Sequence, residues 1–200
     1  MRRLHPIGRH EVPADHGTIR QPDGRLDVWT VHALPEQRHV VRVAEGDGTL
    51  WHLTLDHAAR PERLQARWQD GGRSVEATLT FFDDEVLIWR RGAEPGSQAM
   101  AIPTGARLLW PPIAGRDWCL AGIAVDNPEE MAAVIVQRRP LADGALDVCP
   151  VTVSARREGD VLTLAMAGRP EARMTLDPAG RLRAWQEGDI LFERVAGAGP

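Results

Sequence analysis

The sequence predicts an all-β protein, built as one large curved antiparallel meander sheet that forms a β-roll or an open barrel. Segments that alternate apolar and polar residues recur along most of the chain, which is typical of half-buried strands. Glycine, proline and aspartate separate these segments at short intervals, as in hairpins. With 200 residues, of which 43% are apolar and 26% charged, the chain is long enough to bury a core without disulfides or metals.

The pattern divides the chain into a leader and one β-rich domain. Residues 1–25 are rich in Pro, Gly, Asp and His without periodicity, so we expect an irregular leader with one short strand near residues 18–21. The β-rich domain covers residues 26–197. Its three parts are a first meander (26–102), a central irregular or short helical segment (103–145) and a second meander (146–197).

The first meander begins with a hairpin. A tight turn at Pro35-Glu36 would pair residues 26–34 with residues 38–44 and place His32 opposite His39. Because side chains alternate along a strand, this register decides which of them face the core.

The next turn, at residues 45–49, continues the meander and sets Val43 opposite Trp51. The apolar face of the hairpin thereby extends into a third strand. The same parity places Trp29 and Trp89 on the other face of the sheet.

Gly71-Gly72 predicts a two-residue hairpin turn, since two glycines accept the positive φ angles of a type I′ turn. In that register the facing pairs are Trp68 and Val75, Ala66 and Ala77, and Leu64 and Leu79. Turns at Asp83-Asp84 and Pro95-Gly96 then add two strands, the last with Met100 on the inner side.

The central segment is interrupted by Pro103, Pro111 and Pro112. Asn127-Pro128-Glu129-Glu130 has the composition of a helix start, with a capping Asn, Pro at the first helical position and acids in the first turn. The β-branched run from Val134 to Val136 makes a strand the alternative.

The second meander repeats the hairpin pattern. A turn at Glu158-Gly159 would match Ala155 with Leu162, and Val153 with Leu164. Further strands are expected over residues 171–177, 181–186 and 190–195.

Two parts of the chain resemble each other. Thr54-Leu55-Asp56, followed by Arg63-Leu64 and Trp68, resembles Thr175-Leu176-Asp177, followed by Arg181-Leu182 and Trp185. The alternative is that any Asp-capped hairpin in an arginine-rich chain looks like this. The second copy is one residue shorter, which places Trp185 on the opposite face from Trp68 unless a bulge intervenes.

A long meander with one apolar face, scattered tryptophans and repeated Leu-Asp turns is similar to the glycolipid-binding and LolA-like lipoprotein-carrier β-roll proteins. The resemblance covers the strand pattern of residues 26–195, with residue-level likeness around Asp56 and Asp177 and in the strand from Ile190 to Val195. It implies a curved sheet that holds a lipid or glycolipid. The chain departs from the carriers because it shows no export signal and no lipid-attached cysteine near its start, which argues against periplasmic transport.

The charge and composition of the chain limit the classes of partner that it is expected to bind. The net charge of −4 and the lack of any basic cluster argue against nucleic acid. The apolar runs are too short for a transmembrane segment, and none follows Arg2-Arg3, so we expect a cytoplasmic protein. In that compartment Cys119 and Cys149 should be reduced core residues.

The predicted function is non-enzymatic binding of an apolar or amphipathic ligand, a lipid or glycolipid, inside the curved sheet. Its predicted contacts are Trp51, Trp68, Leu79 and Met100, because large aromatic residues beside small alanines can leave room for a ligand. The alternative is a protein-interaction or structural domain with a packed core, in which the outer tryptophans contact a partner or a second copy in a homodimer.

A metal-dependent or Cys-dependent hydrolase is a third reading. All seven histidines lie within the first 57 residues, and the first hairpin would place His32 beside His39 as two metal ligands. No His-x-His or Cys-x-x-Cys spacing accompanies them, so we expect no metal site and no cofactor. No nucleophile elbow or phosphate-binding loop is present in a suitable context either.

Overall fold

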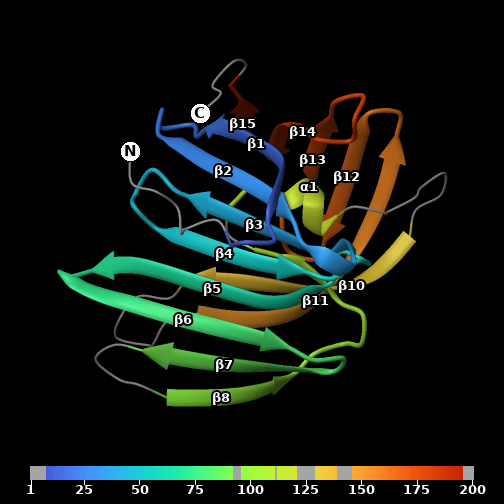
Figure 1. The fold of residues 1–200 in the computed structure, drawn as a ribbon. Coiled ribbons are helices and arrows are strands. Elements are labelled where there is room, and N and C mark those ends of the chain that lie inside the picture. Colours follow the sequence, from blue (N-terminus) through green and yellow to red (C-terminus); the bar gives the residue numbers. More distant parts are fainter. Residues whose placement is uncertain (1–7, 92–95, 111, 121–128, 139–145, 196–200) are drawn as a thin grey trace.

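A computed structural model describes residues 8–91, 96–110, 112–120, 129–138 and 146–195. These residues form one 15-stranded sheet that curls without closing (Figure 1). Neighbouring strands are antiparallel, apart from the parallel pair β9 and β10. The predicted fold class, an all-β curved antiparallel meander, is confirmed. No helix among the described residues is long and apolar enough to cross a membrane.

The strands form two meanders. The first comprises β1 (Val12–Arg20), β2 (Leu26–Ala33), β3 (His39–Ala44), β4 (Leu50–Leu55), β5 (Pro61–Asp70), β6 (Arg73–Phe81), β7 (Glu85–Arg91) and β8 (Gly96–Ala101). The second comprises β10 (Glu129–Arg138), β11 (Leu146–Glu158), β12 (Val161–Met166), β13 (Ala172–Leu176), β14 (Leu182–Glu187) and β15 (Ile190–Arg194), with the short edge strand β9 (Arg107–Leu109) beside β10. Two short helical elements, η1 (Pro35–Gln37) and α1 (Arg116–Cys119), complete the fold.

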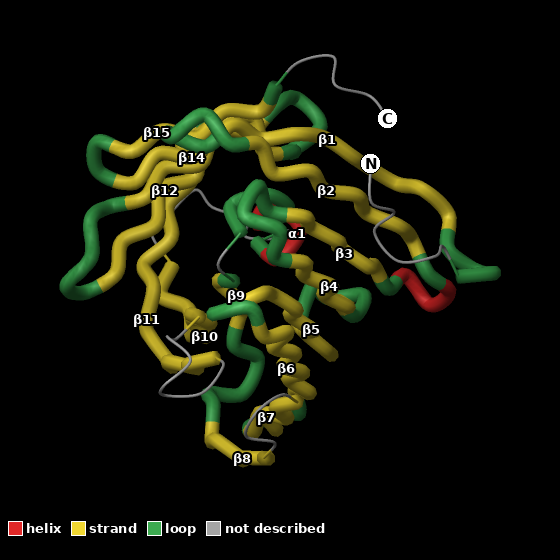
Figure 2. Tube along the Cα trace, turned by 90° about the vertical axis from the view of Figure 1, so that its left-hand side faces the viewer, coloured by secondary structure: helices red, strands yellow, loops and turns green. Residues whose placement is uncertain are grey.

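The two meanders meet where β1 pairs with β15, through Ile19 opposite Arg194 and Arg20 opposite Glu193. From that seam the first meander runs out to the edge strand β8 and the second to the edge strand β9. Figure 2 shows the two meanders facing each other across the curl, with α1 between them.

Strand β1 lies within the predicted leader. It includes the short strand expected near residues 18–21 but begins already at Val12, so the prediction of irregular structure is wrong for residues 12–17. The sequence hides the strand because Gly17, opposite Trp29, stands on the inner face where an apolar side chain would mark the alternation. A Cβ atom on Gly17 would lie 2.0 Å from Cη2 of Trp29, so the indole ring occupies the space that a side chain would fill. The position therefore requires glycine.

The β2–β3 hairpin differs from the prediction by one residue. Its turn contains three residues, with Glu36 and Gln37 both at positive φ, so Ala33 rather than His32 stands opposite His39. A shift of one residue exchanges the faces of a strand. Trp29 accordingly stands opposite Val43 on the inner face and is only 1% exposed, which overturns its predicted outer position.

The β3–β4 and β5–β6 hairpins form in the predicted register. Pro95 of the turn predicted at Pro95-Gly96 lies outside the described residues, and Gly96 already belongs to β8. Val43 stands opposite Trp51, and Trp68 stands opposite Val75. Gly71 and Gly72 have φ angles of +53° and +80°, the left-handed conformation that the two-residue turn needs.

In the second meander the β11–β12 hairpin pairs Ala155 with Leu164 rather than with Leu162. The turn residues are Gly159-Asp160, which shifts the register by two and leaves the predicted faces unchanged. The predicted helix start fails at Glu129, where the strand β10 begins, and its Asn127-Pro128 lies outside the described residues. The central segment therefore supplies strands to the sheet.

The predicted internal similarity has a structural basis in two equivalent turns. Oδ1 of Asp56 accepts hydrogen bonds from the N–H groups of Ala58 and Arg60, and Oδ1 of Asp177 accepts them from Ala179 and Arg181. A register shift precedes each aspartate. Trp185 follows Asp177 at the same distance in sequence as Leu64 follows Asp56, so the counterpart of Trp185 is Leu64 rather than Trp68. All three side chains are buried.

Residues 103–110 and 112–120, called the central plug below, fill the inside of the curl (Figure 2). Its buried side chains belong to the same core as the inner face of the sheet: Ala106, Leu108, Leu109, Trp110, Ile113, Ala114, Trp118, Cys119 and Leu120. The core is therefore a sheet wrapped around a folded segment of its own chain.

Candidate functional site

The central plug is fixed against the first meander at Gly115. This residue has a φ of +78°, and a Cβ atom on it would lie 2.6 Å from Cγ1 of Val41. On the same side, Nη1 of Arg107 donates a hydrogen bond of 2.6 Å to the carbonyl oxygen of Ala58. The plug is thus held directly on the inner face of β3 and on the turn after β4.

The plug is also fixed against the second meander, through α1. The buried Asp117 carboxylate lies near the backbone of Leu182, at the start of β14, which acts to lower its pKa. Burial raises the pKa of Asp117 to about 6, because a charged carboxylate is costly away from water. Next to it, the ring of Trp118 lies between His39 and Arg181.

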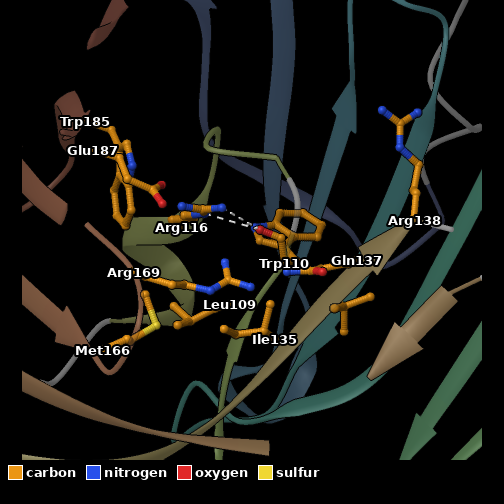
Figure 3. A pocket seen from close by; sticks show the side chains of 11 residues that line it. Leu109, Trp110, Arg116, Ile135, Gln137, Arg138, Met166, Arg169, Trp185 and Glu187 are labelled. Atoms are coloured by element: carbon orange, nitrogen blue, oxygen red, sulfur yellow. Dashed lines mark hydrogen bonds between the residues drawn. The ribbon is translucent and has the colours of Figure 1, made fainter. Parts of the chain in front are cut away.

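A pocket of about 290 Å³ lies between the plug and the second meander (Figure 3). Its described lining comes from the plug, from β10, from the end of β12 and the turn after it, and from β14: Leu109, Trp110, Arg116, Ile135, Val136, Gln137, Arg138, Met166, Arg169, Trp185 and Glu187. These residues combine apolar walls with three arginines and one carboxylate.

Two tryptophans form the rigid part of this wall. Trp110 and Trp185 are fully buried, and Trp110 packs edge to face against Trp51 with ring centroids 6.3 Å apart. The indole N–H groups of Trp110 and Trp185 have no hydrogen-bond acceptor among the described residues. Because both indole nitrogens are themselves buried, the wall that these two residues offer to a ligand is formed by their rings.

Arg116 stands at the base of the pocket. Its Nε and Nη2 atoms donate hydrogen bonds of 3.2 and 2.9 Å to the carbonyl oxygen of Trp110, and its guanidinium lies 4.4 Å from the ring centroid of Trp185. Burial lowers the pKa of Arg116 to about 10, an effect that the nearby Glu187 opposes. Arg116 therefore remains positively charged at neutral pH.

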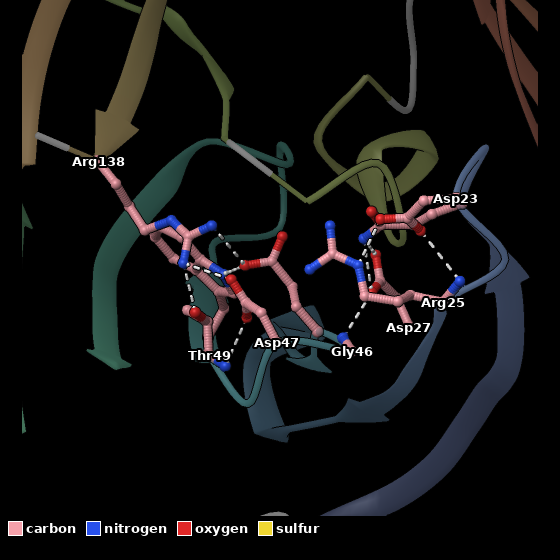
Figure 4. A network of polar contacts seen from close by, with 10 residues as sticks. Asp23, Arg25, Asp27, Gly46, Asp47, Thr49 and Arg138 are labelled. Carbon is pink, nitrogen blue, oxygen red and sulfur yellow. Dashed lines mark hydrogen bonds and ion pairs between the residues drawn. The ribbon is translucent and has the colours of Figure 1, made fainter. Parts of the chain in front are cut away.

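Arg138, at the end of β10, links the pocket to a polar network at the turn between β3 and β4 (Figure 4). Its Nη1 atom donates to Oδ2 of Asp47 at 2.9 Å and to the hydroxyl of Thr49. Glu45, in the same turn, accepts a hydrogen bond of 2.6 Å from the indole of Trp51, and burial raises its pKa. The network joins the second meander to the first beside the pocket.

The four predicted ligand contacts lie elsewhere. Trp51, Trp68 and Leu79 are buried in the core, and Met100 packs against that core. None of them lines the pocket described above or the two cavities found on other parts of the surface. Trp51 contacts Trp110 of the plug, so the plug occupies the space on that side of its ring. A role of the four residues in ligand binding stays a prediction.

The predicted histidine pair does not form, because the register places Val40 opposite His32. Nδ1 of His32 instead lies 3.1 Å from Nη1 of Arg42, which makes a paired ion contact with Glu11. Among the described residues no group of three or more His, Cys, Asp or Glu side chains could hold a metal ion.

The environment of Cys119 does not activate its thiol as a nucleophile. No disulfide joins Cys119 to Cys149. Burial raises the pKa of Cys119 to about 12, which keeps the thiol protonated at neutral pH. This argues against hydrolysis through Cys119.

Sequence reasoning missed the residues that line the pocket. Trp110 and Arg116 lie in the central segment, where the prolines interrupt any strand pattern. The similarity that matches Arg181-Leu182 with Arg63-Leu64 predicts the wrong counterpart for Trp185. A usable signal was the shared Asp turn, because counting from Asp177 predicts Trp185 on the inner face.

A second, larger groove of about 670 Å³ lies on the outer face of β5 to β8. Trp89, which is 50% exposed, stands there between Thr78 and Ser97 of the neighbouring strands. Its outer position was predicted. The groove is lined otherwise by polar side chains, including Arg63 and Arg91.

Comparison with known proteins supports the fold alone. No protein-family model matches the sequence, and no curated protein does. Among solved structures, a DUF1089 family protein of Pseudomonas aeruginosa is similar over 93% of this chain and 97% of its own, with a TM-score of 0.52 and 11% sequence identity. A β-barrel-like DUF1849 protein of Brucella abortus covers 92% of this chain and 94% of its own, with a TM-score of 0.47 and 13% identity. At such identity the first similarity extends to the fold and not to residues of the site.

Proposed function

We propose that the protein binds an apolar or amphipathic small molecule, without chemical conversion, in the pocket between the central plug and the second meander. The observation that carries the proposal is the lining itself. Buried tryptophans and aliphatic side chains form the walls, while a few oriented polar groups converge on the same space, as in ligand sites generally.

The volume of the pocket limits the size of the ligand. Pockets for small molecules typically measure about 300–1,000 Å³, and this one, at about 290 Å³, lies at the lower limit. It accommodates a small amphiphile, or the head and first part of the chain of a larger lipid. A lipid or glycolipid, as the sequence suggested, remains compatible with this size.

The lining favours binding over catalysis. None of the described residues that line the pocket is a serine, threonine, cysteine or histidine, and the one carboxylate among them, Glu187, lies near Arg116. A hydrolytic site needs a nucleophile and a base within hydrogen-bond reach of each other.

The test is direct detection of a ligand. A native mass spectrum of the purified protein, recorded before and after organic extraction, would show a co-purified molecule. Titration of the extracted protein with decanoate and with 1-decanol, followed by tryptophan fluorescence, should show saturable binding of at least one. Met166→Trp should abolish it by filling the pocket, whereas Trp89→Phe, on the outer face, should leave it intact. Absence of a co-purified mass, together with no binding of either probe, would rule the function out.

The outer groove favours the second candidate, a protein-interaction role. A half-exposed tryptophan on the outer face of a sheet, as Trp89 is here, is a common type of anchor for a protein partner. Sedimentation of the wild type and of Trp89→Ala would test for self-association: a dimer that dissociates in the variant supports this role, and a monomer in both removes the homodimer.

A further inference from the structure

Arginines outnumber carboxylates among the described residues that line the pocket. Arg116, Arg138 and Arg169 are accompanied there by one carboxylate, Glu187. Arg138 is bound to Asp47, and Arg116 lies near Glu187 and Glu45. Arg169 is exposed beside the apolar walls and forms no ion pair with a carboxylate of the described residues.

We infer that the ligand of this pocket is an amphiphile with an anionic head, a carboxylate or a phosphate monoester, held at Arg169 and Arg116. The inference rests on the proposed function and names the class of ligand. It follows from the position of the two guanidinium groups against tryptophan and aliphatic walls (Figure 3).

Arg116 supplies a cation in a fixed position. Its guanidinium is oriented by the carbonyl oxygen of Trp110 and by the ring of Trp185, so little side-chain freedom is left to lose when an anion arrives. An arginine held in this way presents a planar set of donors that suits carboxylate and phosphate oxygens.

Arg169 supplies the accessible cation. It lies in the turn between β12 and β13, where its backbone N–H donates to the carbonyl oxygen of Met166 at 3.2 Å. Its side chain is exposed, and no carboxylate of the described residues forms an ion pair with it. Its positive charge acts on Arg116, so the two guanidinium groups can share one anion.

The remaining lining suits the rest of such a molecule. Leu109, Ile135 and Met166 provide aliphatic surface for a hydrocarbon chain. The rings of Trp110 and Trp185 add aromatic surface to the same wall. One end of the pocket thus recognises charge and the other recognises apolar surface.

The test compares probes that share a ten-carbon chain and differ in the head: decanoate, decyl phosphate and 1-decanol, titrated at neutral pH and low ionic strength. Hydrogen bonds to charged groups contribute about 1.5–3 kcal/mol, so at least one anion should bind about 10- to 100-fold more tightly than the alcohol. The better anion identifies the head as carboxylate or phosphate. Added salt should weaken only the anions.

A matched pair of variants tests whether Arg169 binds the anionic head of the ligand. Arg169→Gln should remove most of the preference for the anion and leave the affinity for 1-decanol unchanged. Arg183→Gln removes one charge from an exposed arginine of β14 that does not line the pocket, and it should leave the preference intact.

The outcomes separate this inference from the proposed function. Equal binding of anion and alcohol by the wild type, or an equal loss of preference in both variants, would overturn the anionic head while the binding function stands. Failure of every probe to bind, with no co-purified molecule, would overturn both.

Discussion

The guanidinium of Arg181 lies 3.7 Å from the ring centroid of Trp118. Arg181 belongs to the turn before β14, in the second meander, whereas Trp118 belongs to α1 in the central plug. The Trp118 ring also approaches His39 of the first meander, with ring centroids 4.8 Å apart. One side chain of the plug therefore connects the two halves of the sheet.

Replacing this side chain should destabilise the whole fold. Trp118→Ala removes a large buried ring and should lower the free energy of unfolding by about 3–5 kcal/mol. Arg181→Ala removes only the cation over the ring, which contributes about 1 kcal/mol at a partly exposed site. Urea unfolding of both variants measures the difference. A Trp118→Ala protein as stable as the wild type would show that the plug does not hold the halves together.

Gly115 should be the least tolerant glycine of the plug. Gly115→Ala forces an alanine to a φ of +78° and also brings its Cβ to 2.6 Å from Val41. Gly105→Ala is the matched control, because Gly105 has a φ of +73° but no atom within 4 Å of such a Cβ. Both changes cost the left-handed strain of about 1–2 kcal/mol, and only the first adds a steric clash. Equal melting temperatures of the two variants would show that the contact with β3 relaxes freely.

The hairpins with clear turn chemistry were predictable from the sequence, and the unusual turn was not. Gly71-Gly72 fixes both the length and the conformation of its turn, so the pairing of Trp68 with Val75 followed. The β2–β3 turn places Glu36 and Gln37 at positive φ, where glycine or asparagine would be expected. Because nothing in the sequence marks this turn, the observed strand register differs from the predicted one by one residue. That single residue moved Trp29 from the outer face to the core.

Asp117 should make stability depend on pH. Its folded pKa, about 6, lies above the ordinary value of 3.8, so the folded state holds an extra proton between these values. Its contribution to stability is therefore fully present below about pH 4 and is lost as the pH rises through 6. The difference between the two pKa values corresponds to a change of about 3 kcal/mol in the free energy of unfolding.

The comparison with Asp117→Asn isolates this effect from that of other groups. An asparagine has nearly the same shape and an amide oxygen that can accept a hydrogen bond, but it carries no charge at any pH. From pH 4 to pH 7.5, chemical denaturation should show the variant gaining stability relative to the wild type. Parallel pH profiles for the two proteins would contradict the assignment.

The ion pair of Glu11 with Arg42 should matter far more than a surface pair. Arg42 is buried, and Glu11→Ala would leave its charge uncompensated, at a cost of about 3–5 kcal/mol. Glu158→Ala, which breaks an exposed pair with Arg156, should cost less than about 1 kcal/mol.

The hydrogen bonds from Arg42 lower the pKa of Glu11, so its stabilising effect is present above the ordinary value of 4.5 and is lost as the pH falls through the folded value. Thermal unfolding at neutral and acidic pH measures both effects. Equal losses in Glu11→Ala and Glu158→Ala would refute the distinction.

The candidate site was beyond single-sequence reasoning for a physical reason. A pocket arises where segments distant in the chain meet, and here the plug brings Trp110 and Arg116 to Trp185 of β14. Alternation along a strand predicts which face is buried, and it correctly grouped Trp51 with the core. It cannot predict that a proline-rich segment folds back into the curl and fills that space.

The seam between β1 and β15 has a consequence for the order of folding. Each meander consists of hairpins between neighbouring segments, which close short loops and form quickly. The pairing of Ile19 with Arg194 closes almost the whole chain into one loop and carries the largest entropy cost. The two meanders should therefore form first and join in a slower step. The anion-binding pocket, which depends on the docked plug, should appear only in that last step.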